Sequence, residues 1–536
     1  NSFGAGIAPL ELPIGAESSF RGVADLLSDT AITYEGGKPT TGPIPSDMEA
    51  QERAVHDSLI EGIVVADDDL MERYLEGESL DFKELEETLA HGVASAQVFP
   101  VLCGSAAKDI AIDRLATFIC EIGPSPLDRP GVVVDAGDQQ REIRPEPGGQ
   151  VLASVFKTLA DPYVGKISLF KVVSGTVRPD AVLTNPRTHA DEKLHGLFTL
   201  RGKEQVPVNE VPAGDLAAVA KLGDVTTGDT LAPRGTPVVI PRPPTPVPVL
   251  SVAIRPKSKG DEDKLMTALH RIQEEDLALF VRRDDETHQT LLSGMGEAHL
   301  AIATERLARK FGVEVETEDV IVAYRETITA TADAEGKYKK QTGGHGQFGV
   351  AFLRVEPLPR GGGFEFEDKI VGGAIPRQFI PAVQKGIEET MSRAGVFGYP
   401  VVDVKAICFD GKFHPVDSSE MSFKMAGSIG FRDAMAKANP VLLEPISLLE
   451  VTVPPAYQGD VMGDLNSRRG RVQGTEQADD GESLVTALVP TSEILRYAID
   501  LRSITGGRGR FTASHDHYDP LPPHLYDKVR RDSATS

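Results

Sequence analysis

The stretch KYKKQTGGHGQFG, at residues 337–349, places three lysines and four glycines just before a strand-like run. Glycine tolerates positive φ and lets the backbone approach a ligand closely, so the amides of such a turn can face a phosphate or the edge of a base. A flexible hairpin without a ligand is the plainer interpretation. The stretch is therefore either a projecting tip that meets an anion or an ordinary hairpin.

A second stretch, FDGKFHPVDSSEMSFK at residues 409–424, repeats this design. A strand-like end leads into an Asp-Gly turn, a lysine, a histidine and a helix start with Ser418 or Ser419 as its cap. His414 is a candidate for a catalytic or metal-binding role, because acidic residues lie near it in the sequence. A structural role as a cap is the alternative. Two such stretches in one chain favour a pair of tip loops over an isolated hairpin.

These two stretches resemble loops of bacterial elongation factor G. Members of that family carry QSGGRGQYG and DGSYHEVDSSEMAFK where this chain has QTGGHGQFG and DGKFHPVDSSEMSFK. Further landmarks follow in family order: DPYVG at 161–165, SGMGE at 293–297, VAYRETI at 322–328 and GRG at 507–509. The resemblance covers nearly the whole chain and implies a ribosome-binding translational GTPase that moves tRNA and messenger RNA.

The resemblance also implies a place for the two loops, at the end of a central domain that enters the decoding site. There His414 would face RNA, beside tRNA and messenger RNA. The chain departs from the family pattern at His345, commonly arginine, at Phe348, commonly tyrosine, and at Pro415. These departures keep open a paralogue that acts in ribosome recycling, rescue or protection with weak translocation. The RNA-facing residues expected at the tip are Lys339, Lys340, Gly343, Gly344, His345, Gly346, Gln347, Lys412 and His414.

Length and composition indicate several domains. With 536 residues and roughly 150 residues per domain, the chain predicts three or four. Its three cysteines form no even disulfide framework and no metal-ligand spacing, and no apolar run reaches the roughly 18 residues of a membrane helix. We therefore expect a cytoplasmic, reduced monomer with no membrane partner. Because the chain opens at Asn1 without a signal peptide, we also expect a piece of a longer protein with a P-loop upstream.

The charge is unevenly distributed. The formal net charge is −24, which is unusual for a protein that binds RNA. Residues 1–125 hold 23 acidic and 7 basic residues, a net charge of −16, so most of the imbalance lies there. The C-terminal half is nearly balanced, and its basic residues are clustered.

Residues 1–125 alternate strand-like and helical runs, the pattern of an α/β domain. VLCGSA at 101–106 is an apolar strand that enters a small-residue turn, and the resemblance gives Ser105 and Ala106 a nucleotide-binding role. The chain has neither a Gly-x-x-x-x-Gly-Lys-Ser/Thr loop nor an Asn-Lys-x-Asp motif, so it lacks the residues that hold phosphates and Mg²⁺. We interpret the segment as the C-terminal part of a GTPase domain with an insertion subdomain. GTP and Mg²⁺ are expected in the full-length protein; for this chain we expect no bound cofactor, no catalytic residue and no GTP hydrolysis.

The rest of the chain predicts four further domains, giving a multidomain α/β and α+β protein. Short strand-like runs with turn signals at 146–234 predict a β-barrel, domain II. Strands separated by helices predict ferredoxin-like split βαβ folds at 248–323, domain III, and at 446–536, domain V. Between them, residues 324–445, domain IV, combine period-two strands with amphipathic helices, typical of a central α+β domain that carries the tip loops.

Basic turns in domain V can pair with RNA phosphates, although a solvated arginine face is the alternative. The HDHY stretch at 515–518 puts two histidines on one face of a strand. Together with His345 and His414, these histidines are compatible with a function of a different class, that of a metal-dependent hydrolase. The resemblance instead implies an ordinary strand end, no metal, and the ribosome as partner through rRNA, tRNA, mRNA and stalk proteins. The expected ribosomal RNA contacts are Arg468, Arg469, Arg471, Arg508 and Arg510.

Overall fold

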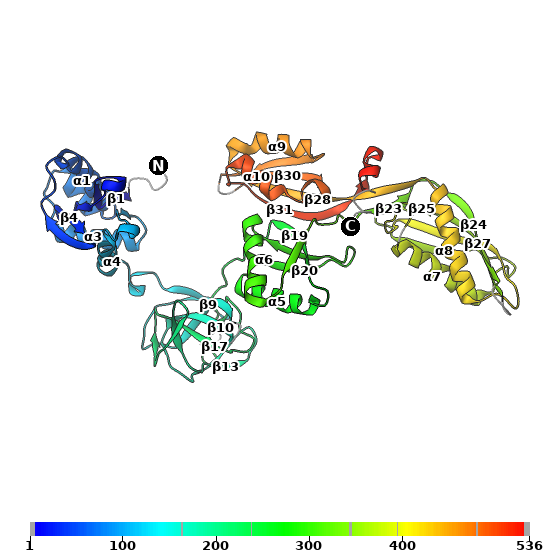
Figure 1. Ribbon diagram of the computed structural model, residues 1–536, viewed down its shortest axis with the longest axis horizontal. Helices are drawn as coiled ribbons and strands as arrows, with labels where there is room; N and C mark the ends of the chain where they lie inside the picture. Colours follow the sequence, from blue (N-terminus) through cyan, green and yellow to red (C-terminus); the bar gives the residue numbers. More distant parts are fainter. Residues whose placement is uncertain are drawn as a thin grey trace. The chain divides into compact units, whose positions relative to one another are not determined.

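The computed structural model describes residues 6–161, 164–236, 238–341, 346–393, 395–478 and 481–529. The chain forms two compact units, Asn1–Pro243 and Pro244–Ser536. Figure 1 labels the helices and strands along the chain. Helical and sheet segments build several separate apolar cores, which confirms the predicted multidomain α/β and α+β fold.

In its described residues, the first part of unit 1 packs two sheets and four helices around a main apolar core, with a smaller apolar cluster around Val23 and Ile110. β1 (Ile7–Pro9) and β6 (Phe99–Val101) pair in parallel, while four further strands form an antiparallel sheet in the order β2-β3-β4-β5. The α/β pattern predicted for residues 1–125 is therefore present. The remaining elements are β2 (Glu11–Ile14), β3 (Gly22–Asp25), β4 (Thr30–Glu35), β5 (Lys38–Gly42), α1 (Glu49–Val64), α2 (Asp68–Leu75), α3 (Phe82–Ala94) and α4 (Ile112–Glu121).

A hairpin of β7 (Val132–Ala136) and β8 (Gln139–Ile143) precedes domain II, whose strands enclose a main apolar core and a smaller apolar cluster around Phe198. Six strands pair in the order β15-β14-β17-β10-β9-β18, and two ribbons, β11–β16 and β12–β13, complete the domain. Pairing among the described strands follows an open path, so the expected barrel consists of open sheets wrapped around the core. The strands are β9 (Leu152–Asp161), β10 (Gly165–Ser174), β11 (Thr176–Val177), β12 (Val182–Thr184), β13 (Asp191–Lys193), β14 (Phe198–Arg201), β15 (Glu204–Pro207), β16 (Val211–Pro212), β17 (Leu216–Ala220) and β18 (Thr230–Leu231).

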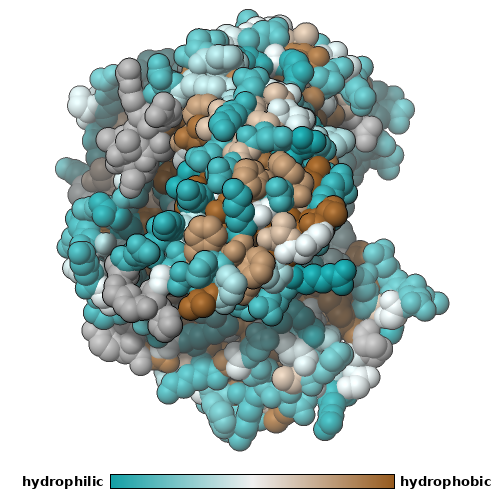
Figure 2. Space-filling model, turned by 90° about the vertical axis from the view of Figure 1, so that its right-hand side faces the viewer, coloured by the Kyte–Doolittle hydropathy of each residue, from teal (hydrophilic) through white to brown (hydrophobic). Residues whose placement is uncertain are grey.

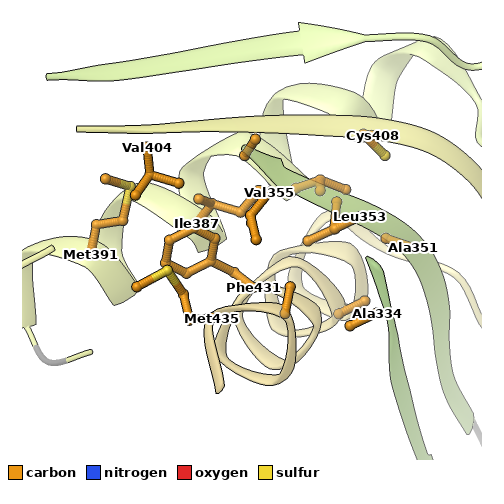
Figure 3. Packing of buried hydrophobic residues seen from close by; sticks show 14 of the residues in the cluster. Ala334, Ala351, Leu353, Val355, Ile387, Met391, Val404, Cys408, Phe431 and Met435 are labelled. Atoms are coloured by element: carbon orange, nitrogen blue, oxygen red, sulfur yellow. The ribbon is translucent and has the colours of Figure 1, made fainter. Parts of the chain in front are cut away.

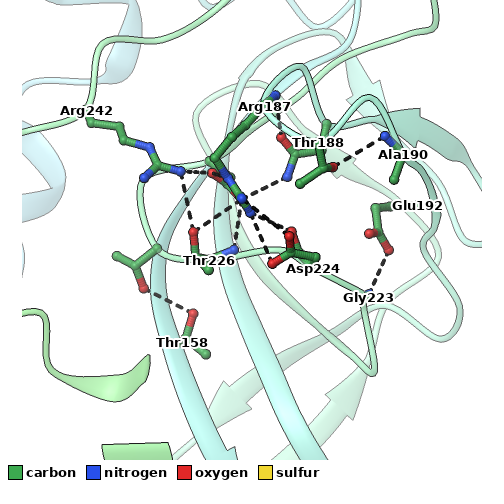
Figure 4. Close-up of polar contacts among 12 residues, drawn as sticks. Thr158, Arg187, Thr188, Ala190, Glu192, Gly223, Asp224, Thr226 and Arg242 are labelled. Atoms are coloured by element: carbon green, nitrogen blue, oxygen red, sulfur yellow. Dashed lines mark hydrogen bonds and ion pairs between the residues drawn. The ribbon is translucent and has the colours of Figure 1, made fainter. Parts of the chain in front are cut away.

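A buried carboxylate fixes the loops of domain II, in the region where Figure 4 shows Arg187, Thr226 and Arg242 converging. Asp229 accepts hydrogen bonds from Arg187 Nε at 3.0 Å, Asn185 Nδ2 at 2.8 Å and the Thr226 amide at 2.9 Å, and it pairs with Arg242. Burial opposes ionisation of this carboxyl, but the donors outweigh it and lower the pKa of Asp229 to about 2. The carboxylate thus ties together three separate segments of the domain.

Domain III is a four-stranded antiparallel sheet in the order β20-β21-β19-β22, with two helices between the strands. β21 lies between β19 and β20, so the predicted split βαβ arrangement is confirmed. The helices bury apolar side chains at helical spacing, among them Leu269 and Ile272 of α5 and Leu300 and Leu307 of α6. The elements are β19 (Leu250–Pro256), α5 (Glu262–Glu275), β20 (Phe280–Arg283), β21 (Thr290–Gly294), α6 (Glu297–Phe311) and β22 (Val315–Glu318).

Domain V repeats the strand order of domain III, as β29-β30-β28-β31, which again confirms the split βαβ prediction. Its long strand β28 (Pro440–Val453) also pairs at its beginning with β23 (Arg325–Ile328) of domain IV. One uninterrupted strand therefore passes through residues 445 and 446, where the two domains were expected to meet. The other elements are α9 (Gln458–Ser467), β29 (Arg471–Gln477), β30 (Ser483–Pro490), α10 (Tyr497–Thr505) and β31 (Arg510–Pro520).

Domain IV is a sheet in the order β24-β25-β27-β26 with two helices packed on it. Figure 3 shows its core, where Leu353 and Val355 of β25 meet Ile387 of α7 and Phe431 of α8. Cys408 is fully buried there, and burial raises the pKa of its thiol to about 12, so it is the core thiol that strand alternation predicts. The elements are β24 (Ala332–Gln341), β25 (Gly346–Pro357), β26 (Phe364–Asp368), α7 (Ile380–Arg393), β27 (Val404–Lys412) and α8 (Glu420–Lys437).

Candidate functional site

The first tip loop closes a long antiparallel hairpin formed by β24 and β25. Lys339 and Lys340 are exposed near the end of β24. The predicted tip residues Gly343, Gly344 and His345 lie outside the described residues. Because the hairpin stays paired up to Gln341 and Gly346, its lysines are carried on regular sheet rather than on a loose segment.

The second tip loop follows β27 and is hydrogen-bonded to the first. The amide of Gly346 donates to Asp417 Oδ1 at 3.2 Å, and the amide of Phe348 donates to the Asp417 carbonyl at 2.8 Å. In return, the hydroxyl of Ser418 donates to the Phe348 carbonyl at 2.8 Å. A Cβ on Gly346 would lie 3.0 Å from the Asp417 carboxyl carbon, so a glycine suits this close approach. The two stretches that the sequence paired therefore form one surface.

His414 lies on that surface with half of its side chain exposed. Its Nδ1 accepts hydrogen bonds from the amides of Asp417 at 3.2 Å and Val416 at 3.4 Å, while its own amide donates to Ser418 Oγ at 2.8 Å. Its ring meets Phe348 edge-on, with 6.4 Å between centroids. With Nδ1 accepting these amides, Nε2 is the nitrogen that can carry a ring proton toward solvent; Asp417 Oδ2 also lies 3.3 Å from Nδ1. His414 thus both shapes its turn and presents an N–H donor.

The second loop leads into α8 through a serine cap. Ser419 Oγ accepts the Ser422 amide at 3.2 Å, which confirms one of the two predicted caps. Further along, α8 touches β24 directly, because a Cβ on Gly336 would lie 1.9 Å from the Ala426 carbonyl oxygen. This contact fixes the helix against the hairpin that carries the first loop.

A third loop, which was not predicted from the sequence, reaches the same end of domain IV. Residues 369–376 connect β26 to the helical segment before α7, and Ile375 of this loop packs against Gly411 near the end of β27. Val371 is 84% exposed and precedes Gly372 and Gly373, whose φ angles of 69° and 75° lie in the left-handed region. The Gly-Gly pair before a proline was the available signal, since it marks a loop.

Most of the tip is polar, with exposed apolar side chains among the charged ones. Lys412 and Gln347 are exposed, and so are Phe413, Val416 and Met421. Figure 2 faces the side of the molecule at the right of Figure 1 and shows mainly hydrophilic residues, with hydrophobic ones gathered near the middle. The predicted basic character of the tip is therefore accompanied by apolar surface that the sequence analysis did not single out.

The base of domain IV is held by a buried carboxylate from the VAYRETI motif. Glu326 is fully buried and accepts the amides of Val396 at 2.7 Å, Phe397 at 2.8 Å and Tyr399 at 2.8 Å. Despite these donors, burial raises the pKa of Glu326 above its ordinary value. A Cβ on Gly395 would lie 2.4 Å from this carboxylate, so the turn can close only around a glycine. Glu326 therefore fixes the loop between α7 and β27.

Two of the predicted RNA-contacting arginines are held inside domain V by carboxylates. Arg468 bonds to Asp464 at 2.8 Å and to Asp500 at 2.9 Å, and Arg469 forms a two-pronged pair with buried Glu444 at 2.7 and 2.9 Å. Their side chains are only 19% and 29% exposed. This geometry gives both a structural role, because each guanidinium neutralises partly or fully buried acids. An RNA contact for either one stays a prediction.

The other three arginines are more exposed. Arg471 pairs with Asp519 at 2.6 Å and Arg508 lies over the Tyr457 ring at 5.0 Å, while Arg510 is 62% exposed. An exposed ion pair such as Arg471–Asp519 contributes little to stability, so this guanidinium can exchange its carboxylate for a phosphate at small cost. Arg510 pairs with Glu482, whose side chain is 24% exposed. These three arginines are the stronger candidates for RNA contact in this domain.

The predicted nucleotide-binding turn is closed on itself. The Ser105 amide donates to the Ile110 carbonyl at 2.9 Å and the Ile110 amide donates back at 3.0 Å, with Ala106 exposed between them. Upstream, the Cys103 amide donates to Glu11 Oε2 at 2.9 Å. The turn is thus a defined loop anchored to β2 through Glu11, and a nucleotide contact for Ser105 and Ala106 stays a prediction.

Comparison with known proteins shows which family combines these domains. Four family models match: Elongation factor G domain 2 at residues 150–233, Elongation Factor G, domain III at 245–319, Elongation factor G, domain IV at 321–439 and Elongation factor G C-terminus at 441–529. A crystal structure of a protein from Thermus thermophilus is 37% identical, with a TM-score of 0.70, over 99% of this chain and 77% of that chain. The chain belongs to the elongation factor G family.

Elongation factor G membership confirms the resemblance drawn from the two tip stretches and implies an interaction with the ribosome. Both tip loops fall within the match to domain IV. Within the described part of the chain, no helix is long and apolar enough to cross a membrane, and no group of three or more His, Cys, Asp and Glu side chains gathers as a metal site would require. The family's other functional assignments remain matters of proposal.

Proposed function

We propose that this chain is the ribosome-binding portion of a translational GTPase that promotes movement of tRNA and messenger RNA, with domain IV entering the decoding site. The joint surface of the two tip loops carries the proposal, because Gly346, Phe348, Asp417 and Ser418 connect them through hydrogen bonds. On this surface an exposed histidine and exposed lysines are held by sheet and helix, so they can meet RNA without ordering a flexible segment first.

The proposal assigns a steric and conformational role to this chain. Exposed cations at the tip would pair with phosphates, and the Nε2–H of His414 would donate to a phosphate, ribose or base oxygen. Contacts from domains II and V would add to the affinity, since linked modules bind more tightly together than each alone. Stalk proteins would meet the acidic first segment, and the protein would act as a cytoplasmic monomer.

GTP and Mg²⁺ belong to the proposed full-length protein, and this chain fits them only in part. Ser105 and Ala106 offer a turn for the base, but the sequence contains neither a P-loop lysine nor an Asn-Lys-x-Asp motif. The residues present cannot hold the β and γ phosphates, so no step of the mechanism here runs through the nucleotide.

A second candidate function is a paralogue that acts in recycling, rescue or protection with weak translocation. The departures at His345, Phe348 and Pro415 favour it, because all three lie in or beside the tip loops. The metal-dependent hydrolase is disfavoured by placement, since His414 lies at the tip of domain IV whereas His515 and His517 lie on β31 of domain V. An assay of ribosome binding together with tRNA movement separates the first two functions.

Ribosome binding at increasing salt tests the proposal. Replacing Lys339 and Lys340 by alanine should lower the slope of log affinity against log salt by up to about 0.9 per charge, because each neutralised phosphate releases counterions. Lys385→Ala with Lys437→Ala is the matched control, since both lysines are exposed on the helices of the same domain. Co-sedimentation with ribosomes measures both. Failure of the unmodified chain to bind, or equal slopes for the two pairs, would contradict the proposal.

A further inference from the structure

The SGMGE turn at residues 293–297, between β21 and α6, is approached by side chains from two domains. A Cβ on Gly294 would lie 2.9 Å from Nδ1 of His299, in domain III. A Cβ on Gly296 would lie 2.5 Å from the guanidinium of Arg502, in domain V. A Cβ at either glycine would therefore displace a side chain, and at Gly296 that side chain comes from another domain.

The backbone of Met295 in this turn is held at both its amide and its carbonyl. The Met295 amide donates to His299 Nδ1 at 3.0 Å, and the Met295 carbonyl accepts a hydrogen bond from Arg502. His299 Nε2 lies 2.9 Å from the Asp276 carboxylate, which places the ring proton on Nε2 and leaves Nδ1 as the acceptor. His299 thus packs within domain III and orients the turn that Arg502 grips.

Further contacts join domain III to domains IV and V, and one of them, the ion pair of Arg325 with Glu286, lies between β20 and β21. Arg496 pairs with Glu297 at 2.6 Å, and both side chains are well exposed. Ala498 is 4% exposed and packs in the apolar cluster of domain III, while Phe511 borders the cores of both domains. These contacts come from side chains on a few residues and involve no strand shared between the described parts of the two domains.

The connection between domains IV and V is of a different kind. Strand β28 runs through both, pairing first with β23 and then with β30 and β31. Separating these two domains would break a continuous ladder of backbone hydrogen bonds, whereas separating domains III and V breaks mainly side-chain contacts. We therefore expect local opening between domains III and V, where the connection is weaker, rather than between domains IV and V.

We propose that the SGMGE turn and α10 form a releasable latch: when Arg502 lets go of Met295, domains IV and V move together, away from domain III. The latch thereby controls whether the tip of domain IV moves with domain III or independently of it. The latch itself follows from the contacts above; only its use on the ribosome rests on the proposed function.

Hydrogen exchange on the whole chain, without ribosomes, tests the latch. Arg502→Ala should speed exchange of the peptides covering 293–300 and 497–505 together by about tenfold, because it removes a charge-assisted hydrogen bond that joins them. Protection of β28 should stay unchanged. Arg432→Ala is the control, as Arg432 is an exposed arginine on α8 far from the turn in sequence. Arg502→Lys, which keeps a charged donor, should restore part of the protection.

Two results would overturn the latch. Faster exchange confined to 293–300 would show that Arg502 only shapes the turn, and faster exchange that extends into β28 would show that it stabilises domain V itself. Small-angle X-ray scattering adds an independent measurement, since Arg502→Ala should increase the radius of gyration. Neither experiment depends on RNA binding, so a failure here is distinct from a failure of the lysine variants on ribosomes.

Discussion

At the scale of single residues, His414 combines two roles, a structural cap of its turn and an exposed hydrogen-bond donor. From the sequence alone these two roles are alternatives. Its Nδ1 caps the turn by accepting the Val416 and Asp417 amides, and half of its side chain remains exposed. The capping role belongs to any side chain with an acceptor at that distance. The donor role belongs to the imidazole, so substitution can separate the two.

His414→Asn should keep the turn and lose the imidazole. An asparagine oxygen accepts amides two or three residues on, as in an Asx-turn, whereas alanine offers no acceptor. We expect no measurable change in melting temperature for His414→Asn and a loss of about 0.5–1 kcal/mol for His414→Ala. Placed in an elongation factor with an intact P-loop, both variants should still bind ribosomes and both should slow tRNA movement. Normal movement with asparagine would show that the histidine acts only by shaping its turn.

Asp229 supports a prediction about pH. The folded state holds its pKa at about 2, below the ordinary value of 3.8, so ionised Asp229 stabilises domain II above about pH 4. This stabilisation, about 2 kcal/mol, is lost as the pH falls from about 4 toward about 2. Asp229→Asn should therefore lower the melting temperature at neutral pH and flatten its decline in acid. Scanning calorimetry of the chain and the variant measures both; parallel declines in acid would refute the assignment.

At the scale of elements, the sequence predicts best where burial enforces a period. The helices Glu262–Glu275 and Glu297–Phe311 can be recognised from the sequence, because their apolar residues recur at helical spacing. Strands β20 and β22 give little local signal, since FVRR and VETE are short edge strands with few apolar side chains. The hydrogen bonds between the two tip loops join residues that are about 70 positions apart in the sequence. The loop at 369–376 reaches the tip through packing of Ile375 on Gly411. No local sequence pattern indicates either contact.

Contact between α8 and β24 gives a prediction at this scale. Gly336→Ala should destabilise domain IV by about 3 kcal/mol or more, because its Cβ would lie 1.9 Å from a backbone oxygen that cannot rotate away. Gly463→Ala is the matched control: it lies inside α9 with no described heavy atom within 4 Å of the added carbon, and alanine there should stabilise by about 1 kcal/mol. Thermal unfolding measures both, and equal effects would refute the close packing.

At the scale of the whole molecule, the charge distribution separates the roles of the segments. The net charge of −24 lies mainly in residues 1–125, which carry −16. Such a segment repels RNA at long range, whereas the lysines of domain IV and the exposed arginines of domain V attract it. Binding to a ribosome is therefore expected to depend on orientation, with the acidic part directed away from RNA. The net charge of the chain alone argues against RNA binding, whereas the distribution of that charge along the chain is compatible with it.

The last prediction concerns nucleotide turnover by this chain. Phosphoryl transfer requires a loop of amides and a lysine around the β and γ phosphates together with a positioned Mg²⁺, and the sequence of 536 residues contains no such loop. Ser105 and Ala106 lie on a turn whose backbone is closed by Ile110, so at most they contact a base. We therefore expect no GTP hydrolysis above background, with or without ribosomes, while ribosome binding persists. Release of phosphate from labelled GTP measures it, with an intact P-loop translational GTPase as the positive control. Turnover that copurifies with this chain through successive columns would show that phosphate is held by residues other than a P-loop.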